Sequence, residues 1–224
     1  MEAAKAFFDQ KTYNHPEMPE RSHFAELRGF MTKISAKEAE MAVIARGMHA
    51  WHENNSFCPK CGHSTIKTNA GWQRSCTHCK TQHFPRTDPV VIMLVKNGNN
   101  ILLGRSHGWP EKMYSCLAGF MEPGETIEAA VMREVYEETS IKVKNVKYLT
   151  TQPWPFPSSL MIGCVAEASS TKISVDPKEI EHAIWISRED MLEVFSGSSD
   201  SIYPARKGSI AHFLIKKWLV GEIK

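Results

Sequence analysis

GFMEPGETIEAAVMREVYEETSI, residues 119–141, is the most informative segment of the chain. Its second half has the spacing of an amphipathic helix. On a helical wheel of about 100° per residue, Ile127 and Val131 mark an apolar sector, and Glu134 and Glu138 fall inside that sector. Carboxylates on the apolar side of a helix are an anomaly, because burying a charge costs free energy unless it is compensated.

The charges on this helix therefore require a partner. Like charges four residues apart repel each other by about a few tenths of a kcal/mol even when exposed, and on an inward face they cost more. Glu137 adds a third carboxylate on the border of the apolar sector, whereas Arg133 points to a different side of the wheel and cannot neutralise all three. A bound hard cation is the economical solution, and oxygen ligands suit Mg²⁺ or Mn²⁺. The alternative is a solvated acidic face, but Gly119 and Gly124 permit a tight loop close to a ligand.

Outside this segment the hydrophobic pattern is that of a mixed α and β domain. An apolar run over residues 90–95, a strong hairpin turn at Asn97-Gly98 and a second apolar run over 101–103 predict two paired strands. The other predicted elements are a helix over 126–139, strands near 143–150, 160–167 and 182–186, a short helix near 188–195 and a last helix near 207–219.

Three parts follow one another along the chain. Residues 1–54 are predicted to form a short, mostly helical N-terminal segment, in which an extended polar lead-in over the first 20 residues precedes one or two helices within 22–51. Residues 55–86 are rich in cysteine and histidine and have no apolar stripe, so they need a cross-link, such as a bound metal ion, to fold. Residues 87–224 form the predicted mixed domain.

Residues 58–61 (CPKC) and 76–79 (CTHC) give the spacing CxxC-x14-CxxC. Each pair can occupy a tight turn, and two such turns converge on one tetrahedral ion. Four thiolates leave no open coordination position, so we expect a structural Zn²⁺ in a small zinc ribbon. The alternatives are a redox dithiol and a site in which His63 or His78 replaces a cysteine. The predicted zinc ligands are Cys58, Cys61, Cys76 and Cys79.

At residues 119–141 the sequence resembles the Nudix family, whose signature reads G-x5-E-x7-R-E-U-x-E-E-x-G-U, with U a bulky apolar residue. Only Ser140 departs from it, where the family has the glycine that closes the helix. The resemblance implies an α+β fold with a mixed β-sheet sandwiched between helices, and hydrolysis of a nucleoside diphosphate linked to another moiety. It implies Glu134, Glu138 and, close behind, Glu137 as Mg²⁺ or Mn²⁺ ligands, the backbone carbonyl of Ala118 as another, Glu138 as the group that positions the attacking water, and Arg133 as the residue that orients the carboxylates.

A second motif, QPWPFPSS, occupies residues 152–159. Alternating prolines bar a helix or a central strand and predict a stiff, extended loop that holds Trp154 and Phe156 outward. Rigid aromatic faces suit flat heterocycles, and each stack contributes on the order of 1–3 kcal/mol. The alternative is a proline-stiffened connector whose aromatic rings lie in the core.

Together with the preceding ribbon, this motif resembles the QPWPFPxS array of the NADH pyrophosphatase subgroup of the Nudix family. The resemblance covers roughly residues 50–224, with Thr151 in place of the serine that usually precedes the array. It implies that NADH, and less well NAD⁺, is cut to nicotinamide mononucleotide and AMP. Family members usually carry a larger N-terminal domain than the approximately 50 residues that precede the ribbon here, which leaves open whether this is a short natural form or a shortened one.

The subgroup resemblance also implies residue roles. Glu179 matches a further metal ligand, and an ordinary solvated charge is its alternative. Phe84 and Phe120 match aromatic residues that stack on the base, and ordinary packing is the alternative for Phe84. The remaining implied substrate-binding residues are Gln152, Pro153, Trp154, Pro155, Phe156, Pro157, Ser158, Ser159 and Ala211.

Composition limits the other classes of function. A net charge of +2, from 27 basic and 25 acidic residues, gives no broad footprint for a long nucleic acid. No stretch approaches the roughly 20 apolar residues of a membrane span, and the N-terminus lacks a signal-peptide profile, so we expect a cytoplasmic protein. In that setting Cys116 and Cys164 should simply pack in the core. Relatives are commonly dimers, so the resemblance also implies a homodimer.

Two other functions compete with NADH hydrolysis. Removal of NAD caps from RNA 5′ ends would use the same bond and the same pocket, and only the group beyond the adenosine differs. A zinc-ribbon protein that binds nucleic acid and carries a silent Nudix domain predicts a basic ribbon face. The basic residues of 55–86 are instead spread without a cluster, and an intact glutamate set would be unexplained.

Overall fold

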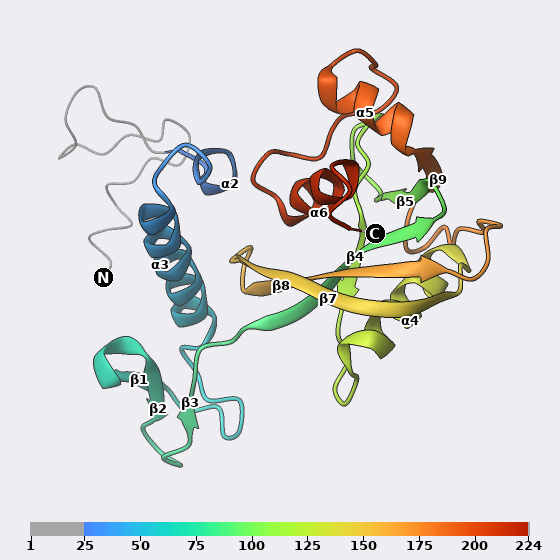
Figure 1. The fold of residues 1–224 in the computed structure, drawn as a ribbon. Helices are drawn as coiled ribbons and strands as arrows, with labels where there is room; N and C mark the ends of the chain where they lie inside the picture. Colours follow the sequence, from blue (N-terminus) through green and yellow to red (C-terminus); the bar gives the residue numbers. More distant parts are fainter. Residues whose placement is uncertain (1–24, 224) are drawn as a thin grey trace. The chain divides into compact units, whose positions relative to one another are not determined.

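The computed structural model describes residues 25–223 (Figure 1). The predicted lead-in over the first 20 residues lies outside this part of the chain. The chain separates into two compact units, Met1–Ala45 and Arg46–Lys224. No helix among the described residues is long and apolar enough to cross a membrane.

Two helices begin the described chain, as the hydrophobic periodicity predicted. α2 (Leu27–Phe30) is a single turn, and α3 (Ala36–Asn54) is long. Ser35 and Glu38 start α3 as a capping box: the Ser35 hydroxyl accepts from the Glu38 N–H (3.3 Å), and the Glu38 carboxylate accepts from the Ser35 N–H (3.0 Å). The break between the two helices therefore has a local cause in the sequence.

The ribbon contains three short antiparallel strands, β1 (Thr65–Thr68), β2 (Gln73–Cys76) and β3 (Gln82–His83), in the order β1-β2-β3. A turn of 3₁₀ helix, η1 (Asn69–Gly71), joins the first two strands. Arg74 of β2 is only 6% exposed, and its guanidinium donates to the hydroxyl (2.7 Å) and carbonyl (3.1 Å) of Thr65. A buried arginine thus helps to tie together a module that has few apolar residues to bury.

The remaining strands form one mixed sheet, which confirms the predicted α+β fold class. They are β4 (Asp88–Asn97), β5 (Asn100–Arg105), β6 (Leu117–Phe120), β7 (Val143–Trp154), β8 (Ser159–Ala168) and β9 (His182–Ser187). The order is β7-β8-β4-β5-β9, and β6 pairs with β4. β4 and β8 are parallel, and the other pairs are antiparallel. A hairpin turn joins β4 to β5 as predicted, but it lies one residue later, at Gly98-Asn99, because Asn97 still pairs with Asn100.

Helices cover both faces of this sheet (Figure 1). α4 (Ile127–Thr139) packs on one face, and α5 (Arg188–Ser196) and α6 (Ile210–Leu219) pack on the other. The central strand β4 is buried on both sides, because Val91 and Met93 belong to the core under α4 while Ile92 and Leu94 belong to the core under α5 and α6. This two-sided burial explains why residues 90–95 are a continuous apolar run rather than an alternating one.

β7 is longer than predicted. The sequence predicted a strand near 143–150 followed by a stiff loop, but β7 continues to Trp154, and Pro153 pairs with Leu160 of β8. Pro153 is tolerated because β7 lies at the edge of the sheet, where one side of the strand needs no hydrogen-bond donor. The predicted loop is therefore limited to residues 155–158, and its assignment to the first part of the motif was wrong.

The C-terminus of α4 accommodates the one departure from the Nudix signature. Ser140 has φ 59° and ψ 12°, the left-handed conformation that glycine adopts at less cost. Its N–H donates to the Tyr136 carbonyl (2.7 Å), and its hydroxyl donates to the Ser174 carbonyl (3.0 Å). The helix-ending turn is therefore kept without the glycine.

Ser140→Gly is expected to stabilise the protein by up to about 1 kcal/mol, because it relieves the left-handed strain. Loss of the exposed hydrogen bond to Ser174 offsets part of this gain. Ser140→Ala is the matched control, since it keeps the strain and loses the bond, and it should be less stable than the natural protein. Urea unfolding of the three proteins measures both effects. A glycine variant no more stable than the alanine variant would contradict the assignment of strain.

Candidate active site

Three of the four carboxylates of α4, those of Glu134, Glu137 and Glu138, differ in how deeply they are buried. Thr126 starts the helix by accepting from the Ala129 N–H (3.2 Å). Glu138 is 8% exposed, whereas the side chains of Glu134 and Glu137 are 13% and 52% exposed. This order follows the helical wheel, because Glu138 in the apolar sector is buried, Glu134 in the same sector is largely buried, and Glu137 on its border is exposed.

Glu134 lies directly against the backbone of β6. A Cβ atom on Gly119 would lie 1.9 Å from Cδ of Glu134 and 2.0 and 2.2 Å from its carboxylate oxygens. Gly119 is not among the glycines with positive φ. Glycine is therefore required here for space rather than for backbone freedom, and the first residue of the 119–141 segment makes room for a carboxylate of its helix.

Arg133 connects the acidic groups to the rest of the protein. Nε and Nη2 donate to the two carboxylate oxygens of Glu125 (2.6 and 2.8 Å). Nη1 donates to Glu134 (2.8 Å) and Glu137 (3.0 Å), and Nη2 also donates to the Phe120 carbonyl (2.8 Å). The helical wheel places Arg133 on another side, but its long side chain reaches back to two of the three carboxylates. These contacts support the expected role of Arg133 in orienting them.

Glu125 received no role from the sequence. Its hydrogen bonds with Arg133 and with the Glu122 N–H lower its pKa to about 2, so it is ionised at neutral pH and anchors Arg133. Glu125 precedes Thr126, the N-cap of α4, so helix periodicity does not predict this pairing, and the fixed spacing E-x7-R was its signal in the sequence.

Glu138 lacks the positive partner that the other carboxylates have. Its Oε2 atom is buried and has no hydrogen-bond partner. Burial, followed by the negative charges of Glu134, Glu179 and Glu137, raises the pKa of Glu138 to about 8, and burial also raises the pKa of Glu134. An acidic cluster with an orphaned oxygen calls for a further positive charge. Because the donors are oxygens only, the residues present fit a hard divalent cation such as Mg²⁺ or Mn²⁺.

Glu179 comes to this cluster from the segment that precedes β9. The N–H of Asp176 donates to the carbonyl of Glu138 (3.2 Å), which satisfies one of the last carbonyls of α4, and the N–H of Glu179 donates to the Asp176 carbonyl (3.1 Å). The charge of Glu179 acts on the pKa of both Glu134 and Glu138. Ala118 also lies close, because it directly precedes Gly119 in β6. Their roles as metal ligands stay predictions.

The four predicted zinc ligands converge. The sulfur atoms of Cys58, Cys61, Cys76 and Cys79 all lie within 4.8 Å of one another, which makes a four-cysteine zinc site. His63 and His78 stack on each other at 4.1 Å between ring centroids and do not belong to the cluster, so the alternative with a histidine ligand was wrong. Cys116 and Cys164 are buried in the two cores, as expected.

Removal of zinc is expected to destabilise the ribbon and to leave the products of the reaction unchanged, because the site has no open coordination position. The ribbon has little apolar core, so its strands should lose protection from hydrogen exchange when a zinc chelator is added. Exchange over residues 58–83, together with product analysis, provides the test. A changed product with the fold intact would contradict a structural ion.

Two polar side chains of the QPWPFPSS motif are engaged within the protein. The Gln152 amide donates to the Gly208 carbonyl (2.7 Å) and accepts from the Ile210 N–H (2.8 Å), so it ties β7 to the start of α6. The Ser158 hydroxyl donates to Asp88 (2.8 Å). Both contacts indicate that these residues hold the motif in place.

The aromatic rings of the motif lie between the two predicted extremes. Trp154 and Phe156 are half-buried, and their ring centroids are 5.0 Å apart at an angle of 65°. Pro155 is buried, whereas Pro153 and Pro157 are exposed. The rings are therefore neither in the core nor fully outward.

The other predicted substrate residues differ in exposure. Phe84 and Phe120 are 63% and 60% exposed, which excludes core packing for either ring in this chain. Ala211 is 4% exposed and its side chain belongs to the core under α6, so it offers no side-chain surface to a nucleotide. Its expected place in the pocket stays a prediction from the resemblance.

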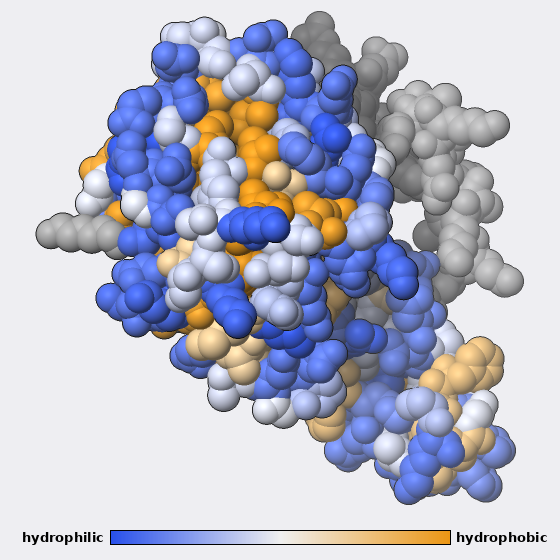
Figure 2. All heavy atoms as spheres, turned by 90° about the vertical axis from the view of Figure 1, so that its right-hand side faces the viewer, coloured by the Kyte–Doolittle hydropathy of each residue, from blue (hydrophilic) through white to orange (hydrophobic). Residues whose placement is uncertain are grey.

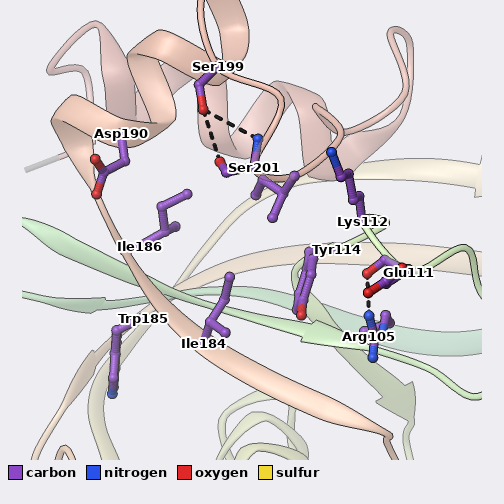
Figure 3. Close-up of a pocket in the computed structure, with 11 residues that line it drawn as sticks. Arg105, Glu111, Lys112, Tyr114, Ile184, Trp185, Ile186, Asp190, Ser199 and Ser201 are labelled. Atoms are coloured by element: carbon purple, nitrogen blue, oxygen red, sulfur yellow. Dashed lines mark hydrogen bonds between the residues drawn. The ribbon is translucent and has the colours of Figure 1, made fainter.

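A separate cavity of about 550 Å³ lies beside β9 and α5 (Figure 3). Figure 2 faces this side of the molecule and shows apolar residues gathered among hydrophilic ones. Two of the cavity's cations are paired within the protein, Arg105 with Glu181 (3.1 Å) and Lys112 with Asp200 (2.9 Å). None of the predicted site residues lines it, so we do not assign the chemistry to this cavity. Its lining residues are Arg105, Glu111, Lys112, Tyr114, Ile184, Trp185, Ile186, Asp190, Ser199, Ser201 and Ile202.

Comparison with known families agrees with this geometry. A model of the NUDIX domain matches residues 85–206, which include the whole carboxylate cluster. The chain belongs to the Nudix hydrolase family. A model of the NADH pyrophosphatase zinc ribbon domain matches residues 53–84, which include the four cysteines of this Nudix protein.

Several curated relatives share both parts. The NAD-capped RNA hydrolase NUDT12 of Homo sapiens is 45% identical over 216 residues, which cover 92% of this chain and 45% of that protein. The mitochondrial NAD(P)H pyrophosphatase NUDT13 of Mus musculus is 38% identical, covering 88% of this chain and 59% of that protein. The NAD-capped RNA hydrolase NudC of Salmonella typhi is 42% identical, covering 73% and 65%. This Nudix chain thus spans about half the length of the first of these relatives.

Solved structures support the fold alone. The crystal structure of a NUDIX hydrolase from Nitrosomonas europaea aligns with a TM-score of 0.59 at 20% identity, covering 74% of this chain and 90% of that one. The architecture of the Nudix sheet and its helices is therefore shared with a protein of low sequence similarity.

Proposed function

We propose that this Nudix protein is a Mg²⁺- or Mn²⁺-dependent pyrophosphohydrolase that cuts NADH, and less well NAD⁺, to nicotinamide mononucleotide and AMP. The observation that carries the proposal is the carboxylate cluster in which buried Glu138 has Glu134 and Glu179 as negative neighbours and its Oε2 atom has no partner. Such a cluster is unfavourable as plain structure and suited to holding a cation beside phosphate oxygens.

The catalytic cation would be held by Glu134, Glu138, Glu179 and the carbonyl of Ala118, where it would neutralise phosphate charge. Arg133 keeps the Glu134 carboxylate in place through its 2.8 Å hydrogen bond, and Gly119 leaves the space for it. A cation beside Glu138 would offset the burial and the neighbouring negative charges that raise its pKa, and the ionised carboxylate would then accept a proton from the attacking water. The water oxygen forms a bond to phosphorus while the bridging P–O bond breaks, which releases the two mononucleotides.

Aromatic surface supports a dinucleotide substrate. The exposed rings of Phe84 and Phe120 and the half-buried rings of Trp154 and Phe156 are flat surfaces of the kind that stack on heterocycles. Relatives named NAD(P)H pyrophosphatase and NAD-capped RNA hydrolase match both the ribbon and the Nudix portion. These observations favour NADH over a nucleoside diphosphate that carries a single base.

The test is turnover of NADH with Mg²⁺ or Mn²⁺, with the products separated by chromatography. We expect equal amounts of AMP and reduced nicotinamide mononucleotide, faster than with an equal concentration of NAD⁺. Release of nicotinamide or of inorganic phosphate in place of these products would contradict the proposal.

Removal of NAD caps from RNA is the second candidate, because NUDT12 and NudC are named for that activity. The two substrates should be compared side by side through kcat/KM on free NADH and NAD⁺ and on NAD-capped RNA. The absence of any preference for the RNA would count against decapping. The homodimer and the cytoplasmic location stay predictions beside this proposal.

A further inference from the structure

The tip of the β7–β8 hairpin, residues 155–158, is contacted by Arg46 and Gly47, two residues of α3 that belong to the same compact unit as the hairpin. Arg46, the first residue of the second compact unit, donates from Nε to the Pro155 carbonyl (2.9 Å). Its guanidinium carbon lies 4.8 Å from the centroid of the Phe156 ring. A Cβ on Gly47 would lie 3.8 Å from Cβ of Pro155, so the helix itself also packs against the tip. One arginine therefore holds both the backbone and a ring of the QPWPFPSS motif.

Phe156 in turn contacts Trp154, so a restraint on the Phe156 ring also restrains the Trp154 ring. The two ring centroids are 5.0 Å apart at 65°, an edge-to-face arrangement that aromatic pairs prefer. A guanidinium near the same Phe156 ring adds a cation–π attraction. The two contacts together limit the rotamers of Phe156, and through Phe156 they limit the orientation of the Trp154 indole.

The far end of the tip has its own anchor. The Ser158 hydroxyl donates to Asp88 (2.8 Å), and the Asp88 N–H donates to the Ser158 carbonyl (2.8 Å). Loss of Arg46 should therefore loosen the near end of the tip, at Pro155 and Phe156 and next to Trp154, while β7 and β8 stay paired.

We propose that Arg46 is a positioning residue for substrate recognition, which orients the Trp154 ring through Pro155 and Phe156. The substrate part of this inference rests on the proposed hydrolysis of a dinucleotide. Among the described residues, Arg46 donates to none of the carboxylates of α4. It should therefore affect binding of the substrate's heterocyclic base and not the hydrolysis step itself. The effect should appear in KM and leave kcat nearly unchanged, because the reacting phosphates are held elsewhere.

The planar guanidinium accounts for the choice of residue. Arginine can donate from Nε and lie on an aromatic face at the same time, whereas the ammonium of lysine is a compact point charge. Arg46→Lys should therefore recover part of the hydrogen bonding to Pro155 but not the contact with Phe156.

The experiment compares Arg46→Ala, Arg46→Lys, Trp154→Ala and the double variant in NADH turnover, with His49→Ala as the control on an exposed part of the same helix. We expect Arg46→Ala to raise KM by about three- to tenfold with kcat within twofold, and Arg46→Lys to lie between it and the natural protein. The KM of the double variant should be little higher than that of Trp154→Ala alone, because Arg46 acts on the substrate only through Trp154 and the two effects are therefore not additive. Fully additive effects, or a loss confined to kcat, would overturn the proposal.

Hydrogen exchange over residues 152–160 gives a readout that does not depend on turnover. Arg46→Ala should speed exchange in this segment, and His49→Ala should not. If NADH proved not to be a substrate while exchange still rose, the proposed function would fail and the positioning of the tip would stand. Unchanged exchange in Arg46→Ala would show that Arg46 does not hold the tip, whatever the substrate.

Discussion

Glu138→Gln is expected to lower the turnover of NADH by about a thousandfold, since general base catalysis alone contributes about 10²–10⁴. Glutamine keeps the shape of the side chain but can neither accept the proton of water nor bind a hard cation as an anion. The measurement is kcat with NADH and saturating Mg²⁺, together with circular dichroism to show that the variant is folded. Near-natural turnover by a folded variant would disprove the assignment of the site.

The same substitution should stabilise the protein when no catalytic cation is added. Burial and neighbouring carboxylates raise the pKa of Glu138 from its ordinary 4.5 to about 8 in the folded protein. Between these values the folded state keeps a proton that the unfolded state releases, so the contribution of Glu138 to stability is lost as pH rises through about 8. At pH 9 the Gln variant should be more stable than the natural protein by a few kcal/mol, on the order of 2–5.

Glu128→Gln is the matched control, because Glu128 lies on the exposed side of the same helix. It should change neither turnover nor the pH dependence of stability appreciably. Urea unfolding of the zinc-loaded proteins from pH 5 to pH 9, without added Mg²⁺ or Mn²⁺, makes the comparison. Parallel stability curves for the natural protein and Glu138→Gln would show that Glu138 does not titrate abnormally.

Gly119→Ala is expected to reduce kcat/KM by about a hundredfold while leaving the fold intact. The added methyl group would lie 1.9 Å from Cδ of Glu134, so the carboxylate must move. The backbone of Gly119 needs no positive φ, and the clashing atoms end a flexible side chain, so the cost in stability should be small. A displacement of about 1 Å at a reacting centre can cost about 10²-fold in rate.

The displaced carboxylate should also weaken cation binding. The Mg²⁺ concentration that gives half-maximal activity should rise in Gly119→Ala, whereas Gly29→Ala, at a position with no atom within 4 Å, should behave like the natural protein. Activity of Gly119→Ala within threefold of the natural protein would contradict the spatial role assigned to this glycine.

Patterns within short stretches of sequence predicted most of the local structure. The wheel of residues 126–139 predicted a helix with Glu134 and Glu138 on its inward side; Glu138 is buried, and the side chain of Glu134 is only 13% exposed. The hairpin between β4 and β5, with its turn one residue later than predicted, and the convergence of the two CxxC turns also followed from local rules. These predictions succeed because helix period, turn type and ligand spacing depend on residues that are neighbours in the chain.

Other features of the site follow from contacts between distant segments. β7 runs through Pro153 only because it is the edge strand, and no local pattern tells an edge strand from a central one. The amide of Gln152 ties β7 to the start of α6, a contact that no local pattern predicts, while its role in substrate binding stays a prediction. The approach of Arg46 to Pro155 joins residues 109 positions apart.

The sequence by itself thus determined the family, the zinc ligands and the helix that holds the acidic cluster. Each of these depends on residues that lie at fixed, short distances along the chain. Only the tertiary structure decided which partners those residues have. It brought Glu179 to the end of α4, placed Glu134 against Gly119 and left Oε2 of Glu138 without a hydrogen bond. The physical reason is that burial and pairing are set by how the sheet and its helices pack, which no short segment encodes.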